Sequence, residues 1–177
     1  RPRRQVRRQI AGGGVDRARQ GLAKGAPFER IDAVCAGLEA RLHEGAALVD
    51  KAFPGTDVKR PIGGRSELID HTTFALEKGV QPTALTSMFT TLDGAPTPAS
   101  AAATVTVYTA PVVALTSLSA EGVPAGDGVA LVTQAWQSGV RDGDLENLGL
   151  TLSQALRNGQ PASLVNDTCD RFRRREA

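Results

Sequence analysis

The chain has 177 residues, of which 41% are hydrophobic, 4% are aromatic and 23% are charged. This composition excludes an intrinsically disordered protein, and the length fits one ordinary domain or two small domains that share a core. Because aromatic residues are scarce, the core must be built from Ala, Leu, Val and Ile.

The formal net charge of +2 conceals two basic ends and an acidic body. The net charge is +7 over residues 1–24, −7 over residues 25–169 and +2 over residues 170–177. Basic ends of this kind favour anionic partners: an acidic protein surface, an anionic membrane face or nucleic acid. The alternative is that the ends fold back onto the acidic body. The arginines expected to bind a partner are Arg1, Arg3, Arg4, Arg7, Arg8, Arg171, Arg173, Arg174 and Arg175.

The predicted organisation is an arm, one helical-repeat domain and a tail. Residues 1–14 end in three glycines and predict a basic flexible arm. The domain covers residues 15–170, with possible halves at 15–93 and 99–170, and residues 171–177 form a basic tail. Within the domain, a short helix is predicted from Val15 to Lys24.

The most regular helix begins after Pro27 and ends near Phe53. Its apolar residues recur at three- and four-residue spacing, which is typical of one buried helix face. These residues are Ile31, Val34, Cys35, Leu38, Leu42, Leu48 and Val49. A loop is predicted over residues 54–65, after which Ser66 is expected to cap the next helix.

Similar apolar faces predict the remaining helices. The helix after Ser66 carries one such face and ends at Gly79, and another starts at Pro82. The apolar positions of these two helices are Leu68, Ile69, Ala75, Leu76, Leu85, Met88, Phe89 and Leu92. Three further helices are predicted after Pro124.

Residues 99–120 leave two interpretations open. The alternation of Thr104-Val105-Thr106-Val107-Tyr108-Thr109 is typical of a strand. The Ala-rich flanks favour a helix, which we expect, with a break or kink at Pro111.

Five similar joints separate these segments, and each has a glycine with Pro or Asp shortly after it. A glycine just past a helix end adopts the left-handed conformation, and Pro or Asp suits the first turn of the next helix. The joints therefore predict helices folded back on one another as hairpins that stack on their neighbours. The five glycines are Gly25, Gly79, Gly122, Gly139 and Gly159.

The segment Gly-Leu-Ala-Lys-Gly-Ala-Pro-Phe-Glu-Arg-Ile at residues 21–31, with weaker echoes over residues 20–170, resembles uncharacterised exported bacterial helical-repeat proteins. The resemblance implies export and a helical fold, and it assigns no functional residue. Export is also expected because the chain begins with Arg1 and its only Met is Met88, as after removal of a signal peptide, although another cleavage would give the same start.

Residues for catalysis or metal binding are few. His43 and His71 are expected on exposed helix positions, and no nucleophile motif accompanies them. Asp142 and Asp144 resemble part of a calcium loop, but Ser153 occupies the twelfth position, so one of the two is better explained as a helix N-cap. We therefore predict no catalytic residue, no metal site and no cofactor.

Cys35 and Cys169 both fall on apolar helix faces. Two buried thiols are expected, as is common for cysteine in helix cores. The alternative is a disulfide between the first and last major helices, which a compact bundle permits and an open solenoid forbids.

The predicted fold is all-α, with about seven or eight helices in antiparallel hairpins stacked as a short right-handed solenoid or a compact bundle. The expected function is a non-catalytic scaffold, an extrinsic periplasmic subunit peripheral to a membrane. Its host would be a larger membrane-associated complex, such as an energy-transducing or photosynthetic one. No segment qualifies as a membrane span, since the uncharged stretch between Asp93 and Glu121 is polar and rich in proline.

Two other functions stay open. One is a small-ligand-binding protein or enzyme with a site between the two helical halves, near residues 94–98. The other is a nucleic-acid binder with basic arms. Nucleic acid is the weaker alternative, because residues 1–10 contain no aromatic side chain to stack on bases and the acidic body repels phosphate.

Overall fold

The computed structural model describes residues 19–53, 62–93 and 105–176, and over these residues it contains helices and no strand. Residues 19–23 form a helical segment. The later elements are α2 (Phe28–Ala52), α3 (Ile62–Glu77), α4 (Pro82–Asp93), the 3₁₀ turn η3 (Val105–Tyr108), α5 (Thr109–Ala120), α6 (Ala125–Gln137), α7 (Asp142–Arg157) and α8 (Ser163–Glu176). The predicted all-α fold is confirmed for this part of the chain.

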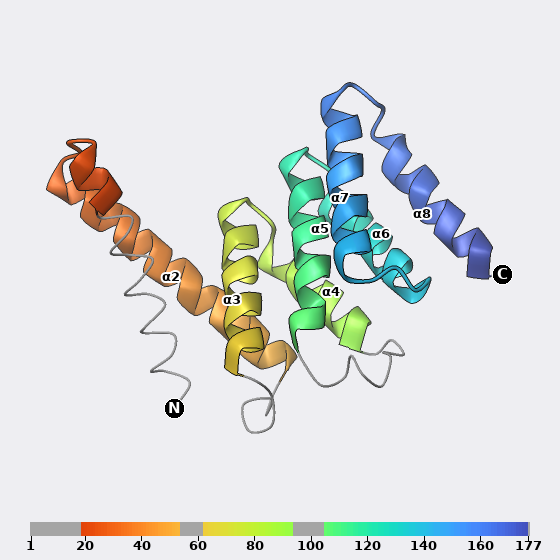
Figure 1. The fold of residues 1–177 in the computed structure, drawn as a ribbon, viewed down its shortest axis with the longest axis horizontal. Coiled ribbons are helices and arrows are strands. Elements are labelled where there is room, and N and C mark those ends of the chain that lie inside the picture. The colour runs from red at the N-terminus through yellow and green to blue at the C-terminus, as the bar shows by residue number, and fades with distance from the viewer. Residues whose placement is uncertain (1–18, 54–61, 94–104, 177) are drawn as a thin grey trace.

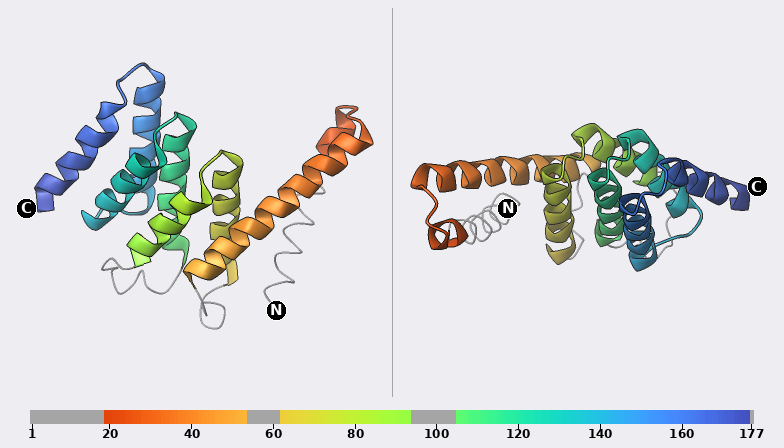
Figure 2. Two further views of the ribbon diagram at one scale, coloured as in Figure 1. Left: turned by 180° about the vertical axis from the view of Figure 1, so that it is seen from behind. Right: turned by 90° about the horizontal axis from the view of Figure 1, so that it is seen from above.

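The helices stack in two layers. Helices α3, α5 and α7 lie side by side in one layer, and α2, α4, α6 and α8 form the other (Figure 1). Each helix contacts the next one in its own layer. The two layers contact each other as well, since α2 packs against α3 and α5 packs against α6. Figure 2 shows that the stack is elongated, with α2 at one end and α8 at the other.

The five predicted joints are confirmed as helix C-caps. Their glycines have φ values between +67° and +90°. At the α3–α4 joint, Gly79 N–H donates to Leu76 O at 3.1 Å and Val80 N–H donates to Ala75 O at 3.0 Å. This pair of hydrogen bonds defines the Schellman motif, and the same pair recurs at the other four joints. The last free carbonyls of these helices are therefore satisfied within the turns themselves.

Residues 99–120, for which the sequence allowed a helix or a strand, are helical where the structure describes them, from residue 105 onward. Val105–Tyr108 is a 3₁₀ turn that leads directly into α5. The predicted break at Pro111 is wrong, because Pro111 is the third residue of α5. An amide in the first turn has no partner within its helix, so a proline there removes no hydrogen bond.

Two predicted N-caps are also wrong. Helix α3 begins at Ile62, so Ser66 lies inside the helix, and residues 62–65 of the predicted loop are helical as well. Helix α7 has Arg141 as its N-cap residue, with Asp142 and Asp144 in its first turn. Their carboxylates lie near the positive end of the helix dipole, which stabilises them without a capping hydrogen bond.

The Arg141 side chain packs against an aromatic cluster in the core. Phe53, Phe89, Tyr108 and Trp136 contact one another with ring centroids 4.5–6.5 Å apart. The Arg141 guanidinium lies 4.1 Å from the Trp136 ring centroid and donates to the carbonyl oxygens of Trp136 and Val140. Phe53, Phe89 and Trp136 come from the layer of α2, α4 and α6, and Tyr108 immediately precedes α5. The cluster therefore connects the two layers.

Helix α2 confirms only part of its predicted apolar face. Leu42 and Val49, in the C-terminal half, are buried, whereas Val34 is exposed and Cys35 and Leu38 are half-buried. Figure 1 shows the cause, since the N-terminal half of α2 extends beyond α3 and away from the stack.

Candidate interaction surface

A hollow of about 310 Å³ opens on the molecular surface between α3 and α5. Both helices contribute side chains to its lining. The lining residues are Asp70, His71, Phe74, Val113, Thr116 and Ser117. Most of this lining is apolar, with polar groups that come from both helices.

The helical period explains why α3 presents these residues. Leu68, Thr72 and Leu76 are fully buried, so positions 70, 71 and 74 fall on the opposite side of the helix. Phe74 is 49% exposed although it is a large apolar residue. The Lys78 ammonium lies 5.2 Å from the Phe74 ring centroid, a cation–π contact that helps to hold the ring in place.

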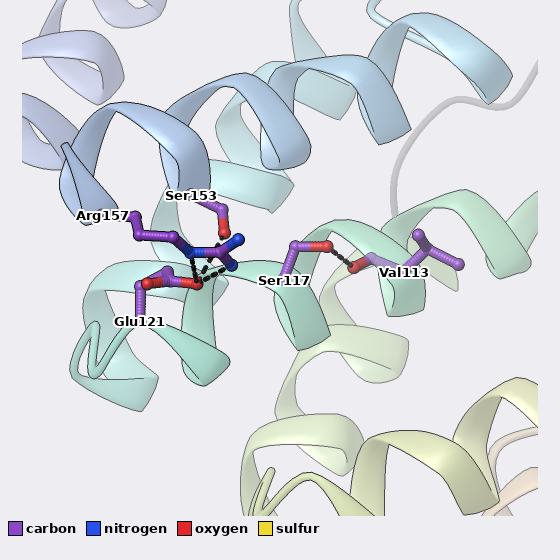
Figure 3. Close-up of polar contacts among 5 residues, drawn as sticks. All are labelled: Val113, Ser117, Glu121, Ser153 and Arg157. Atoms are coloured by element: carbon purple, nitrogen blue, oxygen red, sulfur yellow. Dashed lines mark hydrogen bonds and ion pairs between the residues drawn. The ribbon is translucent and has the colours of Figure 1, made fainter.

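On α5, the two hydroxyl groups of the hollow are bound to their own helix. Thr116 Oγ1 donates to Val112 O at 2.6 Å, and Ser117 Oγ donates to Val113 O at 3.0 Å (Figure 3). His71 and Ser117 line the same hollow, but the Ser117 proton is directed to a backbone carbonyl.

A polar network joins α5 to α7 near the hollow. Glu121 Oε1 accepts hydrogen bonds from Ser153 Oγ at 3.2 Å and from the Arg157 guanidinium, whose Nε lies 3.1 Å away (Figure 3). The hydrogen bond from Arg157 lowers the pKa of Glu121 below its ordinary value, with Ser153 contributing in the same direction. The same pair raises the pKa of Arg157. The network links the C-terminal end of α5 to α7.

The predicted partner-binding arginines are only partly described. Arg1, Arg3, Arg4, Arg7 and Arg8 lie outside the described residues. The other four belong to α8, which continues to Glu176, so residues 171–176 of the predicted tail are the last part of this helix. The side chains of Arg171 and Arg174 are exposed, and those of Arg173 and Arg175 lie outside the described part of the structure.

Cys35 and Cys169 do not form a disulfide with each other. Cys35 lies on α2 and Cys169 on α8, the two helices at opposite ends of the stack (Figure 1). The alternative of a bridge between the first and last major helices is therefore wrong for this fold. Cys169 is buried, as predicted, and Cys35 is half-buried.

The two histidines differ from each other. His43 is exposed, as predicted, with its Nε2 3.7 Å from Glu39 Oε1 one helical turn away. His71 is half-buried in the hollow, so its predicted exposed position is wrong. Among the described residues, no group of three or more His, Cys, Asp or Glu side chains is arranged to hold a metal ion.

Sequence reasoning missed the hollow itself, although one signal for it was present. Phe74 is an aromatic residue outside the apolar face of α3 that Leu68, Ile69, Ala75 and Leu76 define. A large apolar side chain off the core face marks a surface that can bind a partner. The pairing of α3 with α5, which completes the hollow, is a tertiary contact that no local pattern predicts.

Comparisons with known proteins do not place the chain in a family. No protein family, no curated protein and no solved structure matches this chain. Within the described ranges, no helix has the length and apolar character that crossing a bilayer requires.

Proposed function

We propose that the protein is a non-catalytic scaffold that binds a partner protein in the hollow between α3 and α5. The observation that carries the proposal is Phe74, a half-exposed aromatic side chain at the edge of an apolar hollow. Aromatic side chains in apolar depressions are the groups that most often dominate protein–protein binding. A surface of this kind buries one or two side chains of a partner segment.

The charges around the hollow indicate what the partner segment contains. Glu67, Asp70 and Glu77 lie on the exposed side of α3, on the same part of the helix as Phe74, and Lys78 lies beside them. An acidic rim attracts basic residues and repels acidic ones. The proposed partner segment therefore carries an apolar anchor residue flanked by Arg or Lys.

A small-molecule function fits the hollow less well. Ligand pockets enclose most of the surface of their ligand and are about 300–1,000 Å³ in volume. The volume of about 310 Å³ is at the lower end of that range, and Phe74 at its edge is half exposed to solvent. The alternative site near residues 94–98 lies outside the described residues.

The wider role expected from the sequence is part of the same proposal. A scaffold with basic ends, exported and peripheral to a membrane, would dock on a larger assembly through its arginines. Deleting residues 1–14 is then expected to weaken binding to that assembly, with a larger loss at low salt than at high salt because screening removes charge–charge attraction.

Binding at the hollow is tested with synthetic helical peptides of one length. The first has a central Leu flanked by Arg, the second has the same Leu flanked by Glu, and the third has Ser in place of Leu. Fluorescence anisotropy measures the dissociation constant of each peptide for the full chain. The first peptide is expected to bind most tightly, and Phe74→Ser is expected to weaken it by about tenfold or more.

The matched control is Leu150→Ser on α7, because Leu150 is 52% exposed and lies outside the hollow. This variant is expected to bind the first peptide like the unchanged chain. Equal affinity for all three peptides, or an unchanged affinity in the Phe74→Ser variant, contradicts the proposal.

A further inference from the structure

The hairpin tip, which we define as residues 19–34, exposes two large apolar side chains. Leu22 is 62% exposed and Phe28 is 73% exposed, the two highest values among the large hydrophobic residues with high exposure. Leu22 lies in the last turn of the helical segment 19–23, and Phe28 is the first residue of α2. The Schellman turn at Gly25 joins them, so both belong to the apex of the hairpin.

The hairpin tip stands apart from the body of the protein. It lies at the end of α2 that extends beyond α3, at the opposite end of the stack from α8 (Figures 1 and 2). Between positions 28 and 41 of α2 only Ile31 is buried. Of the described helices, none beyond the hairpin itself therefore stands between the apex and a large surface.

Cationic side chains surround the apolar apex. Arg19, Lys24 and Arg30 are exposed, and Lys24 and Arg30 also line a shallow hollow of about 450 Å³ beside the turn. Within the described part of the chain, neither Lys24 nor Arg30 forms an ion pair. Glu29 and Asp32 are exposed as well, which leaves the tip with a net charge of +1, and residues 1–18 add a net +5 directly before it.

We propose that the hairpin tip inserts Leu22 and Phe28 into the surface of an anionic membrane, with Lys24 and Arg30 at the level of the lipid phosphates. Apolar residues flanked by basic ones are the composition of segments that bind the membrane interface. Lys and Arg side chains suit this depth, since their aliphatic stems stay in the apolar layer while their charges reach the headgroups.

The inference does not depend on the proposed partner site. The hairpin tip and the hollow between α3 and α5 share no residue. A membrane-bound tip would present the rest of the stack to other proteins at the same surface, so the two functions are compatible but separate.

Co-sedimentation of the full chain with vesicles tests the proposal. One vesicle preparation is phosphatidylcholine with about one third phosphatidylglycerol, and the other is phosphatidylcholine alone. The chain is expected to bind the anionic vesicles, and the double variant Leu22→Ser, Phe28→Ser is expected to lower the partition coefficient by about tenfold or more. The control Leu150→Ser removes another exposed apolar residue, on α7 and away from the hairpin tip, and is expected to bind normally.

Two matched variants test whether membrane binding requires the positive charge of the hairpin tip. Lys24→Gln and Lys51→Gln remove the same exposed charge from the hairpin tip and from the far end of α2. Only Lys24→Gln is expected to weaken binding to anionic vesicles, and the difference is expected to shrink at high salt.

Insertion is distinguished from adsorption by fluorescence. The native Trp136 is fully buried, so its emission gives a constant background. The emission of a Phe28→Trp variant is expected to shift to shorter wavelength with anionic vesicles, whereas that of Leu150→Trp is expected to stay unchanged.

Three results would overturn the proposal. They are equal binding of the full chain to both vesicle types, no binding to either, and unchanged binding by the Leu22→Ser, Phe28→Ser variant. A fourth contrary result is a concentration-dependent dimer that this variant abolishes, because it would assign the hairpin tip to a second copy of the chain.

Discussion

Single glycines let the helices approach one another closely. A methyl group at Gly149 of α7 would lie 2.6 Å from the Cα of Ala114 on α5, and one at Gly45 of α2 would lie 2.5 Å from Thr73 Oγ1 on α3. The contact with the Ala114 backbone cannot be relieved by a side-chain rotation. The close contact between α5 and α7 therefore depends on the absence of a side chain at position 149.

We expect Gly149→Ala to destabilise the protein by about 1–3 kcal/mol, since the added methyl group forces α5 and α7 apart. The matched control is Gly143→Ala in the same helix, where nothing lies within 4 Å of the added methyl group. That variant is expected to be neutral or stabilised by up to about 1 kcal/mol, because alanine favours the helix. Urea unfolding followed by circular dichroism measures both, and equal effects would contradict the close-packing argument.

Glu121 makes the stability of the α5–α7 contact depend on pH. Its pKa in the folded chain is lowered, first by the hydrogen bond from Arg157, so the carboxylate form favours folding. This contribution is fully present above the pKa of the unfolded chain and is lost as the pH falls through the lower pKa of the folded chain. The effect is small, because Arg157 is largely exposed and water screens the pair.

Arg157→Gln is therefore expected to raise the pKa of Glu121 and to lower the urea midpoint at neutral pH but not at acidic pH below that pKa. Carbon-detected NMR titration of the Glu121 carboxyl group gives the pKa. Arg174→Gln, which removes an exposed charge from α8, is the control. A loss of stability that is the same at both pH values would show that Arg157 acts through packing alone.

The turns between helices are specified by single residues. Gly122 has a φ of +79° and lies just after α5, whereas Gly126 lies in the first turn of α6 with no positive φ. Gly122→Ala is expected to destabilise the protein by about 1–2 kcal/mol, because a Cβ atom is unfavourable in the left-handed conformation. Gly126→Ala is the matched control, since nothing lies within 4 Å of the added methyl group. Thermal unfolding compares the two, and an equal melting temperature would be contrary to the assigned turn.

Sequence patterns could predict the helices and their ends where a local rule applies. The five joint glycines were correctly predicted because a left-handed C-cap needs nothing beyond its own turn. The N-cap of α7 was wrongly predicted: it is Arg141, whose side chain contacts Trp136 of the preceding helix, and no local pattern predicts that contact. Phe74 and the hollow beside it depend on how α3 and α5 pack, so periodicity along one helix could not locate them.

The ends and the middle of the helical stack differ in packing. Helix α5 contacts α3, α6 and α7, and most of its residues are buried. The N-terminal half of α2 has one buried residue, Ile31. In a stacked repeat each helix is stabilised mainly by its neighbours, so local opening is easiest where neighbours are missing.

Hydrogen–deuterium exchange is accordingly expected to be fastest, among the described helices, in residues 28–40 of α2 and slowest in α5. Mass spectrometry of peptic peptides resolves these segments. Addition of anionic vesicles is expected to protect residues 19–34 selectively if the hairpin tip binds the membrane. Uniform protection along the whole of α2 in solution would contradict the packing difference.

The Schellman joints have a consequence for how such a chain can change in length. Each joint closes its hydrogen bonds between residues no more than five positions apart, so its geometry is independent of the elements beyond the next helix. A helix and its joint can therefore be gained or lost by duplication or deletion while the other turns keep their geometry. Such an event would change the position of α8 along the stack and leave the hairpin tip unchanged. The distance between the two ends of the stack can therefore change during evolution in steps of whole helices.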